Sequence, residues 1–200
     1  MKARILVWLV ALFCCHNVLF AQKEFVNASA RLSGHPRILL QKGEEKALKK
    51  VIMKDAVWKD IHQSLVDEAG EIVKLPLNER IKTGRRLLSV SRENLRRIFI
   101  LSYAYRMTGK NEFLKRAESE MLKAASFSDW NPSHFLDVGE MTMALAIGYD
   151  WLYPQLSVQT KKEIENAIVE KGLKPSFDER YNWFVNAVHN WSQVCHAGVT

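Results

Sequence analysis

Cysteine is scarce in this chain: three of its 200 residues are cysteines, and two of them, Cys14 and Cys15, lie in an apolar run at the N-terminus. If that run is removed on export, Cys195 remains as the only thiol. One cysteine cannot form an internal disulfide, even in an oxidising compartment. We therefore expect packing to stabilise the mature chain, and Cys195 to be a small buried residue rather than a nucleophile.

Several catalytic and binding motifs are also absent. The chain has no Gly-x-Ser-x-Gly, no glycine-rich phosphate loop and no Cys-x-x-Cys. His134, His189 and His196 do not follow the ligand spacing of a zinc site, even with Asp137 added. The basic-aromatic motifs of nucleic-acid binding are missing as well. These absences predict a protein that carries no metal or cofactor and does not bind nucleic acid.

The N-terminus has the pattern of a secretory signal. A short basic segment is followed by a mostly apolar run, Ile5–Phe20, and then by a small residue, Ala21. The run is too short for a membrane span, so we expect residues 1–21 to be a signal peptide that is cleaved after Ala21. Acylation of Cys14 or Cys15 is disfavoured, because the residues before them suit a lipoprotein signal poorly. The mature protein is then secreted or periplasmic, without stable membrane insertion.

Charge gives a weaker indication of the partner. The formal net charge is +7, and removal of residues 1–21 lowers it to +5. A modest basic excess in an exported protein suits an acidic partner such as an anionic polysaccharide. The same excess is also compatible with no particular partner.

Helical periodicity dominates the chain after a polar linker at residues 22–34. His35–Leu40 is expected to be a short extended segment, because the residue before a proline is pushed away from the helical region. From there on, apolar residues recur at helical spacing. The helices predicted from this spacing are residues 43–54, 56–74, 93–107, 111–125, 135–153 and 158–172.

The predicted helices alternate in character. The helix at residues 93–107 is apolar on most sides, which indicates burial on more than one face, whereas its partner at 111–125 is amphipathic. The same pair recurs at residues 135–153 and 158–172, with a cap at Ser157. Paired inner and outer helices predict an all-α fold, either part of an α/α barrel or toroid or a solenoid. The pattern does not decide whether a ring closes.

One candidate site precedes the second inner helix. His134 and Asp137 are three residues apart, so on a first helical turn they point the same way. An imidazole and a carboxylate at that position would open into the mouth of a barrel. Alternatively, Asp137 favours the helix dipole and His134 packs against the loop. Glu140 continues the spacing, but we expect it to be structural.

The second candidate site is the stretch from Tyr181 to Gly198, which is dense in aromatic, imidazole and amide groups. Flat apolar faces and hydrogen-bonding groups are what a sugar-binding cleft requires. If Asn190 begins a helix, Asn190 and Gln193 share one face beside Trp191, where their amides could bind a substrate carboxylate. The alternative is a capping asparagine and a surface glutamine.

Four blocks of the sequence belong together in their order and spacing: His35–Leu40, Tyr103–Gly109, Ser133–Tyr153 and His189–Cys195. Together they resemble the heparinase II/III-like polysaccharide lyases. The resemblance extends from about residue 35 to the end, and the last two blocks are the most specific.

In that family an incomplete α/α toroid is followed by a β-sandwich domain, and the enzymes cleave uronic-acid polysaccharides by β-elimination. The resemblance implies that residues 35–200 are the N-terminal part of such a toroid, with a β-sandwich beyond the visible chain. It implies an anionic glycan as substrate, either similar to heparin and heparan sulfate or similar to alginate. We expect residues 22–200 alone to be inactive and poorly folded, because half a toroid exposes inner-helix surface.

The resemblance also implies roles for individual residues. Asn190 matches the position that neutralises the substrate carboxylate, and Gln193 matches a neighbouring polar position. The tyrosine and histidine that act as acid and base are implied to lie beyond Thr200. His189 stands where relatives often have a second asparagine, so the substrate subtype stays open. The further substrate contacts that we expect are His134, Asp137, His189 and Trp191.

Two other functions remain open from the sequence. A glycoside hydrolase on an α/α toroid needs two carboxylates separated by about 5 to 9.5 Å. Asp137, Glu140 and Asp150 are available, but their spacing suggests no convincing pair. A non-catalytic helical module that binds glycans would instead spread aromatic residues along one concave face.

Overall fold

The computed structural model describes residues 34–200 of the chain. The predicted signal peptide, and the predicted linker apart from Gly34, lie outside this range. The described part is helical and contains no strand, only one isolated antiparallel bridge between Thr83 and Arg86. The predicted all-α fold is thus confirmed, while the toroid and the β-sandwich stay predictions. Within residues 34–200 no helix has the length and apolar character needed to cross a membrane.

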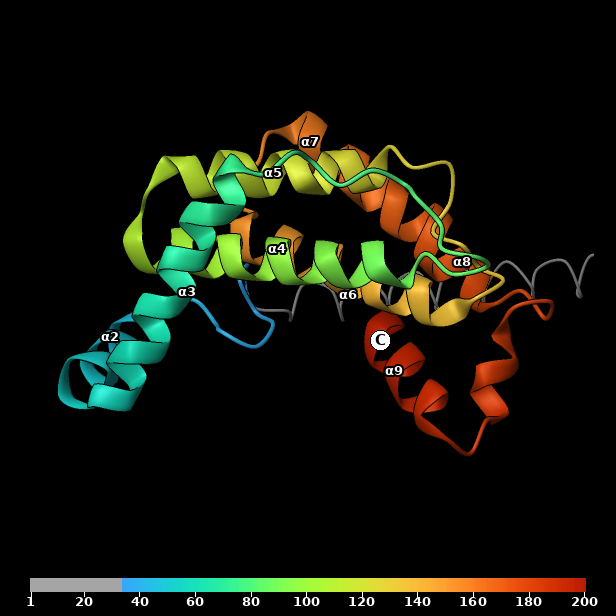
Figure 1. The fold of residues 1–200 in the computed structure, drawn as a ribbon, viewed down its shortest axis with the longest axis horizontal. Helices are drawn as coiled ribbons and strands as arrows, with labels where there is room; N and C mark the ends of the chain where they lie inside the picture. Colours follow the sequence, from blue (N-terminus) through green and yellow to red (C-terminus); the bar gives the residue numbers. More distant parts are fainter. Residues whose placement is uncertain (1–33) are drawn as a thin grey trace, which may run out of the picture. The chain divides into compact units, whose positions relative to one another are not determined.

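The longest connection between the described helices, residues 75–87, joins α3 to α4 (Figure 1). The first six helices correspond to the six predicted ones, although α4 starts earlier than predicted: α2 Glu45–Lys54, α3 Ala56–Lys74, α4 Leu88–Thr108, α5 Asn111–Ala125, α6 Phe135–Leu152 and α7 Val158–Ala167. A π-helical turn extends α7 to Leu173, one residue past the predicted end of that helix. The C-terminal elements are η1 Ile168–Leu173, α8 Lys174–Ser176, the 3₁₀ helix η2 Asn182–Asn186 and α9 Asn190–Val199.

Local sequence signals fix several helix ends. Gly109 ends α4 in the left-handed conformation (φ 75°), and its N–H donates to the Tyr105 carbonyl at 2.7 Å. Glycine adopts this conformation without steric cost. Ser157 caps α7 by accepting from the Thr160 N–H at 3.0 Å, as predicted. The predicted start of α4 was wrong: the helix begins at Leu88, one turn earlier than expected, for a reason described with the site below.

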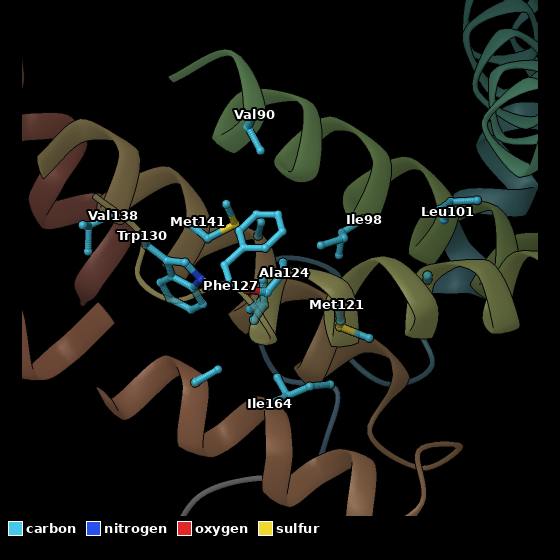
Figure 2. Close-up of a cluster of buried hydrophobic side chains, with 14 of the residues drawn as sticks. Val90, Ile98, Leu101, Met121, Ala124, Phe127, Trp130, Val138, Met141 and Ile164 are labelled. Atoms are coloured by element: carbon cyan, nitrogen blue, oxygen red, sulfur yellow. Dashed lines mark hydrogen bonds between the residues drawn. The ribbon is translucent and has the colours of Figure 1, made fainter. Parts of the chain in front are cut away.

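The core lies where α4, α5 and α6 meet. α6 is buried along most of its length and contacts α4, α5, α7, η1 and α9, as expected for a helix that is apolar all round. Figure 2 shows side chains of four helices and of the α5–α6 loop converging on this core. The labelled members are Val90, Ile98, Leu101, Met121, Ala124, Phe127, Trp130, Val138, Met141 and Ile164.

Glycines allow the closest helix contacts. A Cβ on Gly148 of α6 would lie 2.6 Å from both Ile98 Cγ2 and Met121 Sδ, so α4 and α5 approach the backbone of α6 there. A Cβ on Gly198 of α9 would lie 2.1 Å from the carbonyl oxygen of Gly139 in α6. A Cβ at Gly148 would require the Ile98 and Met121 side chains to shift, whereas a Cβ at Gly198 would require the α6 backbone to shift, so the crossing of α9 over α6 depends more strongly on glycine.

Two of the sequence blocks form a clasp that is structural. The carboxylate of Asp150, buried near the end of α6, accepts from His35 Nδ1 at 2.5 Å and from the Arg37 and Ile38 N–H groups at 2.8 and 2.9 Å. The His35 ring stacks on Tyr153 at 4.0 Å between centroids. Trp151 Nε1 donates to the Ile38 carbonyl at 2.8 Å. The segment that precedes α2 is therefore held against the end of α6.

Candidate functional site

The first turn of α9 carries exposed and unpartnered amides. Asn190 is the first residue of α9, which meets the condition stated for the amide pair, and Gln193 follows one turn later on the same face. Both side chains are exposed, and neither has a hydrogen-bond partner among residues 34–200. His189 caps the helix, because its ring accepts from the Trp191 N–H at 3.4 Å. Two amides and the positive end of the helix dipole thus face solvent together.

Aromatic rings border this turn. Trp191 lies 4.8 Å from Trp183, and Trp183 lies 6.0 Å from His189, measured between ring centroids. Trp183 belongs to η2 and is 46% exposed, so part of its indole face is free. Indole faces next to amide donors are suited to hold a sugar ring. The sequence stretch was predicted as a site, but Trp183 was not singled out in it.

The aromatic border is anchored to the core. Phe184 of η2 is buried and stacks on Phe135 of α6 at 4.4 Å, and it also contacts the His196 ring of α9. His196 Nδ1 donates to the Ser192 carbonyl at 2.6 Å, within the same helix. These contacts fix η2 and α9 against the start of α6, so the first turn of α9 has a defined position.

His134 lies behind this surface rather than on it. It is 2% exposed, and its ring meets the Trp191 ring edge to face at 4.8 Å between centroids. Its Nδ1 donates to Asp137 Oδ1 at 2.9 Å, which fixes the ring orientation. His134 and Asp137 thus point the same way, as their spacing predicted, but into the interior and not into an open mouth. His134 therefore packs against the inner side of Trp191 and is almost inaccessible to solvent.

Asp137 is the centre of a buried hydrogen-bond hub. The side chain is 0% exposed, and both carboxylate oxygens are occupied. Oδ1 accepts from His134, while Oδ2 accepts from the Leu87 N–H at 2.7 Å and from Asn131 Nδ2 at 2.7 Å. We predicted that this carboxylate contacts a substrate, but in this structure it lies out of reach of a ligand. It joins the start of α4 to the start of α6.

The hub also explains the early start of α4. The Leu87 N–H precedes the helix, and a buried carboxylate 50 positions away accepts its hydrogen bond. Asn131 also donates to the Arg85 carbonyl at 2.8 Å. Sequence reasoning missed Asn131. One signal was available in the residue type, because asparagine is one of the few residues other than glycine that readily adopt the left-handed conformation found here (φ 60°).

The other two acidic candidates are also engaged inside the fold. Glu140 accepts from Ser91 Oγ at 2.9 Å and pairs with Arg92 at 3.1 Å, which agrees with the structural role expected for it. Asp150 holds the clasp described above. Asp137, Glu140 and Asp150 therefore each have protein partners, and none offers a free carboxylate for acid-base catalysis.

Cys195 is buried in α9 where that helix crosses α6. Burial, with a smaller contribution from the Glu140 carboxylate, raises the pKa of its thiol to about 12. The thiol is then neutral at physiological pH, and a neutral thiol is a poor nucleophile. The prediction of a small buried residue is confirmed.

Among residues 34–200, no group of three or more histidine, cysteine, aspartate or glutamate side chains is arranged to hold a metal ion. Compared with models of protein families and with curated proteins, the chain has no match.

Proposed function

We propose that this protein is an exported polysaccharide lyase that cleaves uronic-acid-containing polysaccharides by β-elimination. The observation that carries the proposal is the pair of unpartnered amides, Asn190 and Gln193, on the exposed first turn of α9 beside Trp183 and Trp191. The four-block resemblance described above supports the same reaction.

The reaction demands charge neutralisation. The C5 proton of a uronate is poorly acidic, because it lies next to a carboxylate whose negative charge opposes removal of the proton. Donors aimed at that carboxylate withdraw charge and stabilise the enolate-like intermediate. The Asn190 amide supplies such a donor, with Gln193 one turn along. The positive end of the α9 dipole adds to the effect.

The surrounding rings position the sugar. Trp183 and Trp191 offer apolar faces for pyranose rings, and His189 adds a hydrogen-bonding group at the cap. His134 holds Trp191 in place, and Asp137 holds His134. In this proposal His189 and Trp191 touch the substrate, whereas the two buried residues act by positioning.

Elimination also needs a base for the C5 proton and an acid for the leaving glycosidic oxygen. The resemblance implies that a tyrosine and a histidine beyond Thr200 supply them. In this proposal residues 34–200 therefore contribute carboxylate neutralisation and sugar binding, and not proton transfer.

The test is the ultraviolet absorbance of the C4–C5 double bond that elimination creates. The intact protein is incubated with heparin, heparan sulfate, chondroitin sulfate, hyaluronan and alginate in separate reactions. A rise in absorbance on any one establishes elimination and identifies the glycan. Released reducing ends without absorbance would overturn the proposal in favour of hydrolysis. Glycan binding with neither product would overturn it in favour of a binding module.

A further inference from the structure

A second polar feature of the molecule lies at the start of α4. Residues Thr83–Arg86 form a tight turn, in which the Thr83 and Arg86 backbones bond to each other in both directions at 2.9 and 3.2 Å. Gly84 occupies the turn with φ +59°, a conformation that glycine adopts without steric cost. Arg85 and Arg86 follow it, and both side chains are exposed.

Hydrogen bonds with the hub residues Asn131 and Asp137 hold the backbone of this turn in place. The Arg85 carbonyl accepts from Asn131 Nδ2 at 2.8 Å, and the Leu87 N–H donates to Asp137 at 2.7 Å. The backbone on both sides of Arg86 is therefore tied to the start of α6. A fixed backbone lowers the entropy cost of ordering the two arginine side chains around a ligand.

The turn borders an open cavity of about 590 Å³. This volume is within the range of sites that hold small organic ligands, about 300–1,000 Å³. The first turn of α4 forms another part of its wall, so the positive end of that helix dipole is also at the cavity. Its lining residues are Thr83, Gly84, Arg85, Arg86, Leu88, Ser89 and Arg92.

The charges of the cavity are unbalanced. Arg92 pairs with Glu140, but within residues 34–200 neither Arg85 nor Arg86 forms an ion pair. Elsewhere in the described part, arginines with buried side chains are matched by carboxylates, such as Arg97 by Glu120 at 3.0 Å and Arg106 by Glu45 at 2.5 Å. Two guanidinium groups without a carboxylate partner and the N-terminus of α4 therefore border one concave surface, and both features attract anions.

We propose that this cavity binds an anionic substituent, a sulfate or a carboxylate, of a polysaccharide. Both groups present oxygens that a guanidinium fork can bind with two hydrogen bonds. The identification of the ligand as a glycan rests on the proposed function. The arginine cavity is then a second subsite, separate from the Asn190 amide.

The arginine turn is linked to the aromatic border of α9 through buried residues. The Asp137 hub contacts the backbone of the arginine turn on one side and His134 on the other, and His134 contacts Trp191. Three successive contacts therefore connect the arginine cavity with the aromatic border of α9. A single glycan chain that occupies both would place one acidic sugar at Asn190 and another anionic group at the arginines.

The experiment compares two double variants of the intact protein. R85Q/R86Q removes the two unmatched charges, and K49Q/K50Q removes two charges from exposed lysines of α2. Binding of a heparin oligosaccharide and of a hyaluronan oligosaccharide is measured by calorimetry. We expect R85Q/R86Q to weaken binding by roughly ten- to a hundredfold and K49Q/K50Q by less than about twofold, because only the former loses charge-assisted hydrogen bonds.

The two ligands distinguish the two anionic groups. A larger loss for heparin than for hyaluronan identifies sulfate, and an equal loss identifies carboxylate; both support the subsite. R85K/R86K, which keeps the charge but not the fork, is expected to bind with intermediate affinity. Equal weakening by both double variants, or none by R85Q/R86Q, would overturn the inference.

Failure of this inference can be told from failure of the proposed function. Binding is measured without turnover, whereas elimination is measured by absorbance. If the unaltered protein eliminates but R85Q/R86Q binds normally, only the subsite is lost. If R85Q/R86Q loses binding and the unaltered protein shows no elimination, the subsite stands and the lyase does not.

Discussion

Two helix starts in this molecule carry similar residues and differ in almost everything else. α6 begins with His134 and Asp137, and α9 begins with His189 and Asn190. At α6 the polar atoms are buried, and each carboxylate oxygen has a partner. At α9 the amides are exposed and have no partner in the described part of the chain. Residue type alone therefore does not show whether a polar site is enclosed by the fold or open to a ligand.

The two helix starts differ in the hydrogen-bond partners of their polar side chains. A buried polar group must be satisfied by the protein, since leaving it unpaired costs about 1–3 kcal/mol. Once satisfied, it has no bond to offer a ligand. An exposed amide bonds to water, which a substrate can displace. On this basis the α6 start holds the fold together, and the α9 start is available for chemistry.

The largest expected effect is on turnover. Asn190→Ala in the intact protein is expected to lower kcat by roughly two to three orders of magnitude, as for loss of one donor to a developing negative charge. The melting temperature should not change, because the side chain has no partner in the described structure. Asn186→Ala, at an exposed asparagine of η2, is the matched control. Unchanged turnover would show that Asn190 takes no part in the mechanism. The functional contrast between the starts of α6 and α9 would then be lost as well.

The opposite effect is expected at the hub. Asp137→Asn replaces one acceptor by a donor among three groups that already donate, so we expect a loss of about 3 kcal/mol in the free energy of unfolding. Denaturant titration measures it, with Asp67→Asn at an exposed position of α3 as the control. If stability is unchanged and substrate affinity falls instead, Asp137 contacts the substrate after all.

Local sequence signals predicted much of the fold. Periodicity located the helices, and Gly109 and Ser157 marked ends that the structure confirms. These features depend on neighbours within about one helical turn, and such neighbours are visible in a sequence. By contrast, no helix was predicted over α9, and a helix start at Asn190 was only the condition on which the amide pair depended.

Long-range partners were not predictable in this way. The Leu87 N–H finds its acceptor in Asp137, 50 positions away, and His35 finds Asp150 115 positions away. Neither pairing produces a periodic pattern in the amino-acid sequence. The arginine cavity was missed for the same reason, since it needs the turn, the hub and α4 in place together.

A third prediction tests whether α9 must pack closely against α6. Gly198→Ala places a Cβ 2.1 Å from the Gly139 carbonyl oxygen, so the helices must separate. We expect a loss of about 2 kcal/mol in stability and a measurable fall in turnover, because the first turn of α9 moves with the helix. Thermal unfolding and the elimination assay measure the two effects.

Gly70→Ala is the matched control, because a Cβ at that position of α3 meets nothing within 4 Å. Alanine is the better helix former, so this variant should be slightly more stable than the unaltered protein. If Gly198→Ala behaves like Gly70→Ala, the crossing of α6 and α9 does not depend on glycine.

The smallest effect is expected at an ion pair of intermediate burial. Glu93 lies in the second turn of α4. Its side chain is 28% exposed and pairs with Arg96 at 2.7 Å and with Arg97 at 2.6 Å. The hydrogen bond from Arg96 lowers the pKa of Glu93 below the usual 4.5, with burial opposing it and Arg97 adding to it. A lowered folded pKa stabilises the fold above pH 4.5, and this stabilisation is lost as pH falls through the folded value.

Glu93→Gln is therefore expected to cost about 1 kcal/mol at neutral pH and progressively less in acid, where the unaltered glutamate is protonated as well. Urea titrations from pH 7 downward measure the difference, with Glu112→Gln at an exposed position of α5 as the control. A difference that stays constant with pH would show that Glu93 acts through packing and not through charge. If the loss depends on pH and is smaller than that of Asp137→Asn, Glu93 contributes less stability than the buried hub and more than the exposed amides of α9. The reason is that solvent partly screens the charge of Glu93, whereas the hub is fully enclosed.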